Sequence, residues 1–256
     1  EAGVLAHKIS LAKDYGILPG DSPCAEDRLS HTELFDSVFM EQYEAYQKRL
    51  KQTGNVDFGD LILLPYLVLK NNESIRHYTH LRYRFVMVDE YQDSNVAQFL
   101  LLKELVGQNE EAGVTVCVVG DDDQSIYRFR GAEVQNILNF QTEFKDTEIV
   151  RLETNYRSTK EILSCASSVI SHNNERLGKS ICSFHKNGKT PTLIFLPNQD
   201  DETQFCADLI ETQYKKGVPY SDWAILYRTN AQSMGFENDF LKRKIPYTVV
   251  GSLKFY

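Results

Sequence analysis

Apolar residues change their spacing along the chain near residue 85. Before that point they recur every three or four positions, most clearly over 34–50, which is the period of an amphipathic helix. The apolar stretch 61–69 contains Pro65 and is typical of a buried helix that begins or kinks at the proline. We therefore expect residues 1–55 to be helical, with Thr32 as a helix cap, and a further helix around Pro65.

From residue 85 onward, short apolar runs alternate with amphipathic stretches. The runs predict strands at 85–88, 114–120, 148–153, 192–197, 223–228 and 245–251. The stretches between them predict helices at 94–106, 131–144, 158–174 and 201–217, and a short helix capped by Asn230. This alternation indicates an α/β protein with parallel sheets covered by helices on both faces. A boundary between two such sets is expected near 145–158.

Composition restricts the class of protein. The 256 residues are 42% hydrophobic and 25% charged, as in a globular protein with a real core. No apolar run approaches the roughly 18 residues of a membrane span, and the first residues lack the pattern of a secretory signal. Five scattered cysteines without ligand spacing argue against a zinc site and favour a reducing cytoplasm. A net charge of −8 argues against a general nucleic-acid coat but permits a nucleic-acid groove.

Two carboxylates, Asp89 and Glu90, follow directly after the apolar run 85–88. Sites in open parallel sheets form outside the carboxyl ends of the strands. There, one carboxylate can hold a hydrated Mg²⁺ and the other can orient and deprotonate a water. The alternative, helix capping, is expected of the neighbouring Asp93 or Ser94.

The next apolar strand ends in three aspartates, 121–123, followed by Gln124. Adjacent aspartates repel one another unless they are solvated, bound to a cation or capping a helix. The neutral amide of Gln124 can donate and accept, which suits a sensor of phosphate or water. Aromatic and basic residues then alternate, as Tyr127, Arg128, Phe129 and Arg130. Such alternation is typical of a single-stranded nucleic-acid platform, with ordinary core packing as the alternative for the aromatics.

A third cluster, Asn155-Tyr156-Arg157, lies between an expected strand and a helix start. Arg157 there can reach a phosphate and Tyr156 can stack on a base, with an ordinary solvated loop as the alternative. By contrast, the GKS at 178–180 and the GKT at 188–190 are rejected as phosphate-binding loops. The required glycine five positions earlier is replaced by Asn173 and Ser183, and the strand–loop–helix order is missing.

Together, VDEYQDSN, VGDDDQSIYRFRGA and LETNYRS resemble motifs II, III and IV of the UvrD/Rep-type superfamily 1 (1A) DNA helicases. The segments 56–62, 225–233 and 245–256 are similar to further parts of that family, and the first residues resemble its helical 1B insertion. The resemblance implies RecA-like (P-loop NTPase) parallel sheets in two partial lobes. It places a helical 1B-like segment at 1–55, the remainder of domain 1A at 56–150 and the first part of domain 2A at 151–256.

The resemblance also implies roles for the residues that match the motifs. Asp89 would hold Mg²⁺, Glu90 would activate the attacking water, Gln124 would sense the γ-phosphate and Arg157 would act as an arginine finger. Tyr156 would stack on adenine, while Tyr127, Phe129 and Arg130 would belong to the single-strand track. The chain departs from the family pattern at Phe129, where tryptophan is usual, at Met234, where a basic residue is common, and at Ser252, where glycine is common.

The function implied is that of an ATP-dependent 3′→5′ DNA helicase acting in DNA repair or replication. ATP and Mg²⁺ would be its cofactors, single-stranded and duplex DNA its partners beside repair or replication proteins, and the cytoplasm its location, with no membrane partner. The chain opens on Glu1 and lacks the family's P-loop and motifs V and VI. We therefore expect an internal fragment, monomeric and with little or no ATPase activity of its own. The alternatives are a catalytically inactive DNA- or partner-binding module, and the motor part of a RecB/AddA-type helicase–nuclease.

Overall fold

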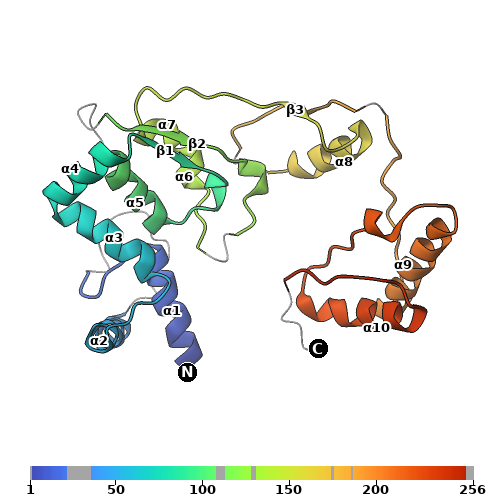
Figure 1. Ribbon diagram of the computed structural model, residues 1–256, viewed down its shortest axis with the longest axis horizontal. Helices are drawn as coiled ribbons and strands as arrows, with labels where there is room; N and C mark the ends of the chain where they lie inside the picture. Colours follow the sequence, from blue (N-terminus) through green and yellow to red (C-terminus); the bar gives the residue numbers. More distant parts are fainter. Residues whose placement is uncertain are drawn as a thin grey trace. The chain divides into compact units, whose positions relative to one another are not determined.

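The computed structural model describes residues 2–21, 36–107, 113–127, 131–173, 176–185 and 187–251. The chain forms two compact units that divide after Gly188, each described here by itself (Figure 1). The predicted domain limits at 55 and 150 stay predictions. No helix among the described residues combines the length and the apolar character needed to cross a membrane.

The N-terminal part of the first unit is helical, as predicted. Its helices are α1 (Ala2–Asp14), α2 (Ser37–Thr53), α3 (Asp60–Asn71) and α4 (Glu73–Arg82). Pro65 lies inside α3. Thr32, the predicted cap, lies outside the described residues, and α2 is capped by Asp36, whose side chain accepts from the Phe39 N–H.

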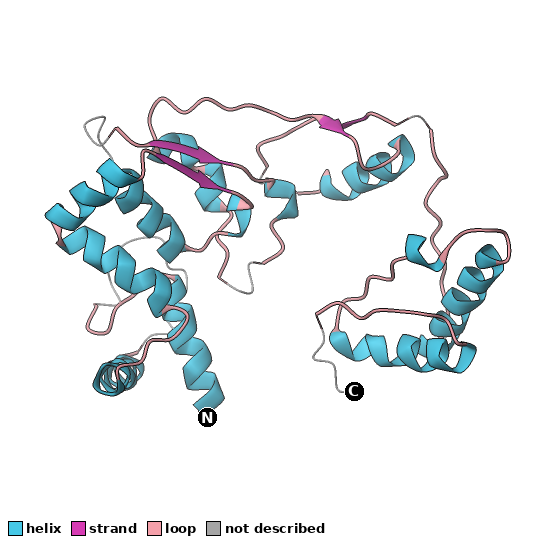
Figure 2. Ribbon diagram, in the orientation of Figure 1, coloured by secondary structure: helices cyan, strands magenta, loops and turns pink. Residues whose placement is uncertain are grey.

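A two-stranded parallel sheet follows, built from β1 (Phe85–Val88) and β2 (Thr115–Val118) with Phe85 opposite Thr115 and Val88 opposite Val118. Between the strands lie the 3₁₀ turn η2 (Tyr91–Asp93) and helix α5 (Val96–Val106), and after them η4 (Asp122–Gln124), α6 (Gln135–Leu138) and α7 (Phe140–Glu143). Figure 2 shows the two strands side by side. The core of this region consists of Tyr91, Phe99, Leu102, Val106 and Phe140.

Helices cover one face of this sheet rather than both. Val86 and Val88 pack into the core, whereas Phe85 and Met87, which point to the opposite face, are 57% and 65% exposed. The predicted cover on the second face is thus not present among the described residues. The helix predicted over 131–144 is two short helices, because α6 ends at Leu138 and α7 begins at Phe140.

The first unit ends with a second, smaller parallel sheet. It pairs β3 (Thr154–Asn155) with β4 (Cys182–Ser183), and α8 (Lys160–Ile170) lies between them in the chain. Thr159 is at the N-cap of α8, but its side chain makes no capping hydrogen bond.

The second unit is built on two helices, α9 (Gln199–Tyr214) and α10 (Ser233–Arg243), with the 3₁₀ turns η6 (Tyr220–Asp222) and η7 (Asn230–Gln232). Its core consists of Ala207, Ile210, Phe236, Phe240 and Ile245. Thr229 rather than Asn230 caps η7, through a capping box with Gln232.

Four predicted strands are wrong for this structure: 148–153, 192–197, 223–228 and 245–251 are irregular. A strand exists only when its N–H and C=O groups pair with a neighbour, and none of these segments has such a ladder among the described residues. Many of their apolar side chains lie open to solvent, with Phe195 86%, Leu226 91% and Val250 92% exposed, whereas Ile245 is buried in the core of the second unit.

Candidate nucleotide-hydrolysis site

The parallel pairing of β1 and β2 brings two polar turns to one edge of the sheet. The pairing continues past both strands, because the Val119 N–H donates to the Val88 carbonyl at 2.8 Å and the Tyr91 N–H donates to the Val119 carbonyl at 2.9 Å. The residues after β1, Asp89 and Glu90, therefore lie beside the turn that begins at Asp121.

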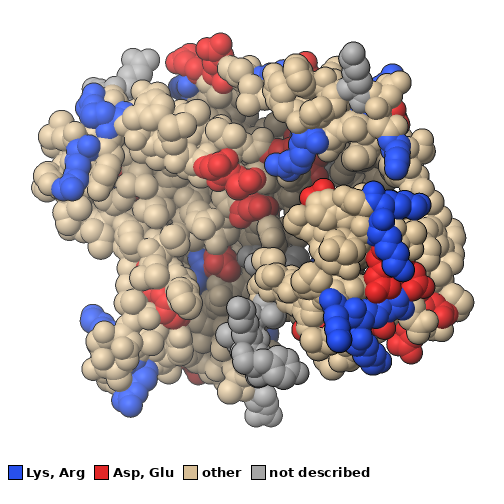
Figure 3. All heavy atoms as spheres, turned by 45° about the vertical axis from the view of Figure 1, so that its right-hand side comes forward, with Lys and Arg blue, Asp and Glu red and all other residues tan. Residues whose placement is uncertain are grey.

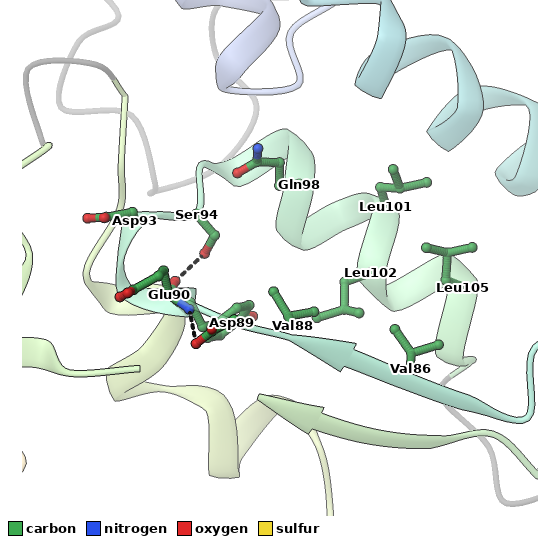
Figure 4. Close-up of a pocket in the computed structure, with 11 residues that line it drawn as sticks. Val86, Val88, Asp89, Glu90, Asp93, Ser94, Gln98, Leu101, Leu102 and Leu105 are labelled. Atoms are coloured by element: carbon green, nitrogen blue, oxygen red, sulfur yellow. Dashed lines mark hydrogen bonds between the residues drawn. The ribbon is translucent and has the colours of Figure 1, made fainter. Parts of the chain in front are cut away.

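Asp89 and Glu90 are both exposed at the end of β1 (Figure 4). The Glu90 N–H donates to Asp89 Oδ1 at 2.9 Å. Glu90 has φ 50° and ψ 41°, a left-handed conformation that is uncommon for a residue with a Cβ and occurs often at functional sites. The two acids lie at one end of a hollow of 390 Å³, whose walls are Val86, Val88, Leu101, Leu102 and Leu105.

The neighbouring Asp93 and Ser94 do not cap α5, so that prediction is wrong by one or two residues. Asn95 caps the helix: its side chain accepts from the Gln98 N–H at 2.9 Å, and its own N–H donates to Gln98 Oε1 at 3.0 Å. Ser94 Oγ donates to the Tyr91 carbonyl instead, at 2.7 Å. Burial, followed by the nearby charge of Glu90, raises the pKa of Asp93 above its ordinary value.

One residue of this site was missed by the sequence analysis. The Gln92 side chain is buried between the two turns, where its Nε2 donates to Glu90 Oε2 at 2.8 Å and its Oε1 accepts from the Asp121 N–H at 3.0 Å. The available signal was a neutral amide inside an acidic stretch, two residues after Glu90.

The three aspartates 121–123 act both as a cap and as a cation site for the protein's own side chains. Asp121 caps η4 by accepting from the Asp123 N–H at 3.0 Å, and it also accepts from Gln124 Nε2 at 2.7 Å. Arg176 binds Asp123 through two hydrogen bonds, of 2.6 and 2.7 Å. Lys179 pairs with Asp121 and lies 3.5 Å from Asp122 and 3.3 Å from Asp123.

These contacts lower the pKa values of two of the three carboxylates. Hydrogen bonds from Arg176 hold the pKa of Asp123 below its ordinary value. Partial burial would raise the pKa of Asp121, but hydrogen bonds from Lys179 and Gln124 outweigh it and lower that pKa. Arg176 and Lys179 thus offset two of the three negative charges of the cluster.

Tyr156 and Arg157 follow β3 in a turn organised by Asn155. Asn155 Oδ1 accepts from the N–H groups of Arg157 at 2.9 Å and of Ser158 at 2.8 Å. Tyr156 is 67% exposed, with its ring centre 5.0 Å from that of Phe184, and Arg157 is exposed.

The structure brings only part of the predicted site together. Asp89, Glu90 and Gln124 lie on the two adjoining turns. In the part of the chain that is described, no hydrogen bond or ion pair joins Tyr156 or Arg157 to Asp89 or Glu90. A path of contacts does connect the regions: residues 176–179 bind the aspartates, and the same segment continues into β4, which pairs with β3. Convergence of Arg157 on the acids stays a prediction.

The predicted DNA-contacting residues are only partly described. Tyr127 is 37% exposed, and its carbonyl accepts from the Ala132 N–H at 3.3 Å. Phe129 and Arg130 lie outside the described residues. Both basic and acidic side chains lie on the face drawn in Figure 3.

The donor chemistry of Asp89 fits a magnesium ion. Mg²⁺ prefers carboxylate oxygens and keeps several of its waters, so it needs an accessible carboxylate rather than a closed cage. Asp89 is exposed, and its Oδ1 accepts from the Glu90 N–H, which steadies the carboxylate at the strand end.

Comparison with known proteins shows which protein family the chain resembles. The family model described as "UvrD/REP helicase N-terminal domain" matches residues 5–145, and "UvrD-like helicase C-terminal domain" matches 150–256. The chain is similar to the ATP-dependent DNA helicase PcrA of Staphylococcus epidermidis, with 41% identity over 88% of this chain and 30% of that protein. It is also similar to the PcrA of Staphylococcus aureus, with 38% identity over 91% of this chain and 31% of that protein. The chain thus spans about 30% of the length of these relatives.

Proposed function

The chain belongs to the UvrD/REP helicase family, and from that premise we propose that it forms part of an ATP-dependent DNA helicase whose hydrolytic residues are Asp89 and Glu90. The observation that carries the proposal is the shared sheet edge, where the two acids after β1 adjoin the Asp121–Gln124 turn after β2. Acids at the carboxyl end of a strand, next to a polar turn, suit the binding and hydrolysis of a nucleotide phosphate.

Each residue then has a chemical task. Glu90 orients a water and accepts its proton as the water attacks the terminal phosphate. Asp89 would hold Mg²⁺, which when bound offsets the negative charge of the phosphates. Gln124, whose amide bonds Asp121, can exchange that contact for a phosphate oxygen. Tyr156 stacks on the adenine. Arg157 stabilises charge on the phosphoryl group once the turn after β3 approaches the acids after β1.

We propose single-stranded and duplex DNA as the nucleic-acid partners, with translocation in the 3′→5′ direction and a role in repair or replication. Tyr127, Phe129 and Arg130 would contact the single strand, by stacking and by charge. Phe129 offers a smaller stacking surface than the tryptophan usual in the family.

The first test is ATP hydrolysis by the full-length protein encoded by the gene, with and without single-stranded DNA. Glu90→Gln keeps the shape of the side chain but removes the base, so we expect kcat to fall by at least about 100-fold. Glu41→Gln, at an exposed position of α2, is the matched control and should leave kcat unchanged. Stimulated turnover that survives Glu90→Gln would refute the proposed role. DNA binding without any turnover would favour the inactive binding module.

Two further measurements test the finer proposals. Unwinding of a 3′-tailed duplex but not a 5′-tailed one is the expected result for 3′→5′ movement. The 256 residues alone should hydrolyse ATP poorly, because they contain no GxxxxGK[ST] loop to hold the β-phosphate. DNA-stimulated turnover by the isolated chain would contradict that expectation.

A further inference from the structure

Gln92 is a buried side chain that joins the two turns of the candidate site. It is 1% exposed, and its amide spans the space between the Glu90 carboxylate and the backbone of Asp121. We infer that Gln92 is a positioning residue for Glu90, an inference that rests on the proposed hydrolytic function. It holds the carboxylate in place and ties its position to that of the Asp121–Gln124 turn.

The partners of Gln92 determine which way its amide points. The Asp121 N–H can only donate, so the amide oxygen must face it. The amide nitrogen must then face Glu90, whose carboxylate oxygen accepts its hydrogen bond. The distances of 3.0 Å to Asp121 and 2.8 Å to Glu90 are those of normal hydrogen bonds. A side chain with both a donor and an acceptor is needed here, and glutamine provides both without a charge.

The residues around the Gln92 amide restrict its position and that of the Glu90 carboxylate. A Cβ at Gly120 would lie 2.7 Å from Gln92 Oε1 and 2.9 Å from Ile137 Cδ1, so the absence of a side chain at Gly120 makes space for the amide. Glu90 itself is in a left-handed conformation, and its side chain is exposed. An exposed carboxylate samples several rotamers unless a partner restrains it. Gln92 is that partner, since it engages one carboxylate oxygen and leaves the other for the water.

The same contact links the base to the sensor. Asp121 precedes η4, and its carboxylate binds Gln124 Nε2 at 2.7 Å. A shift of this turn when Gln124 meets a phosphate moves the Asp121 N–H, and through the Gln92 amide it moves Glu90. The base therefore reaches its working position only when the Asp121–Gln124 turn is in place.

The test compares two variants in the full-length protein encoded by the gene. Gln92→Met removes both hydrogen bonds and is expected to lower kcat for ATP by about 10- to 100-fold, as misplacement of a catalytic group does. Gln92→Glu keeps an acceptor for the Asp121 N–H but replaces the donor facing Glu90, so it should lower kcat similarly. In both variants KM for ATP and the affinity for single-stranded DNA should change less than about twofold, because Gln92 is buried, 1% exposed, and has no surface to offer either ligand.

Hydrogen exchange provides a second readout that does not depend on activity. The Asp121 amide should exchange faster in Gln92→Met than in the wild type but remain protected in Gln92→Glu. Gln135→Met, at an exposed glutamine of α6, is the control for both measurements. If Gln92→Met does not fold, Gln92→Glu alone decides the matter.

The outcomes separate this inference from the proposed function. A wild-type protein without ATPase activity would refute both the proposed function and this inference. An active wild type that is inactivated by Glu90→Gln but retains full kcat in a folded Gln92 variant overturns only the inference. A parallel loss of kcat and of DNA affinity would show a general structural defect and would overturn it as well.

Discussion

Tyr91 and Tyr43 are two buried tyrosines whose hydroxyl groups are in opposite situations. Tyr43 Oη donates to the Ile17 carbonyl at 3.2 Å. Tyr91 Oη is buried without a partner among the described residues, and its ring packs edge-on against Phe140 at 5.5 Å. Burial accordingly raises the pKa of Tyr91 far above its ordinary value. An unpartnered buried hydroxyl destabilises a fold, whereas a bonded one does not.

We therefore expect the two tyrosine-to-phenylalanine changes to have opposite signs. Tyr91→Phe should raise the free energy of unfolding by about 1 kcal/mol, and Tyr43→Phe should lower it by about 1 kcal/mol. Urea unfolding of both variants and the wild type measures the difference. Greater destabilisation by Tyr91→Phe than by Tyr43→Phe would show that the Tyr91 hydroxyl has a partner.

Asp14, at the end of α1, is a half-buried acid whose charge is unfavourable. Its Oδ1 accepts from Asn95 Nδ2 at 2.9 Å, but burial outweighs this contact and raises the pKa of Asp14 to about 6. The folded state therefore holds this proton more tightly than the unfolded state, where the pKa is near 3.8. Stability from this group is present below the unfolded pKa and is lost as pH rises to about 6.

Asp14→Asn should remove that pH dependence while keeping an oxygen for Asn95. We expect no gain in stability at pH 4 and a gain at pH 7.5 of about 1 kcal/mol, a value discounted for solvent screening at a partly exposed site. Urea midpoints at the two pH values measure it. An equal effect at both would mean that the charge of Asp14 is not the cause.

At the scale of elements, a buried lysine joins α1 to α2 and to the start of α3. Lys13 Nζ donates to Asp57 at 2.7 Å, to Asp60 at 2.7 Å and to Gln47 at 2.8 Å, with the lysine side chain fully buried. Partial burial would raise the pKa of Asp57, but hydrogen bonds led by that from Lys13 lower it below its ordinary value. Gln47 Nε2 also donates to Asp60 at 3.0 Å and Tyr46 Oη to Asp57 at 3.0 Å, so the network links all three helices.

Lys13→Met should destabilise the protein by about 3 kcal/mol, because it leaves the carboxylate of Asp60, which is 2% exposed, buried without its cation. The double change Lys13→Met with Asp60→Leu removes both charges and should recover much of that loss. Lys48→Met, at an exposed position of α2, is the control. Thermal unfolding measures all three, and a double variant as unstable as the single one would contradict the argument.

At the scale of the whole molecule, the sequence predicted those features that are determined by residues close together in the chain. The helical periods of α5 and α9 and the apolar run of β1 are complete within a few residues, and the parallel pairing placed Asp89 beside Asp121. The features that were not predicted correctly depend on contacts with residues far away in the chain, which a short sequence pattern does not contain. Arg176 binds Asp123 across 53 positions, and the run 223–228 has the pattern of a strand but no ladder.

The bare apolar segments of the second unit also govern how the protein behaves when concentrated. Residues 192–197 and 224–227 belong to no strand ladder of the described chain, and they carry side chains such as Phe195 and Leu226, both more than four-fifths exposed. Such segments are templates on which a second copy can add itself as a strand. We therefore expect this chain to self-associate and precipitate as its concentration rises. A purification should therefore keep the protein concentration low, so that these segments of different copies do not pair.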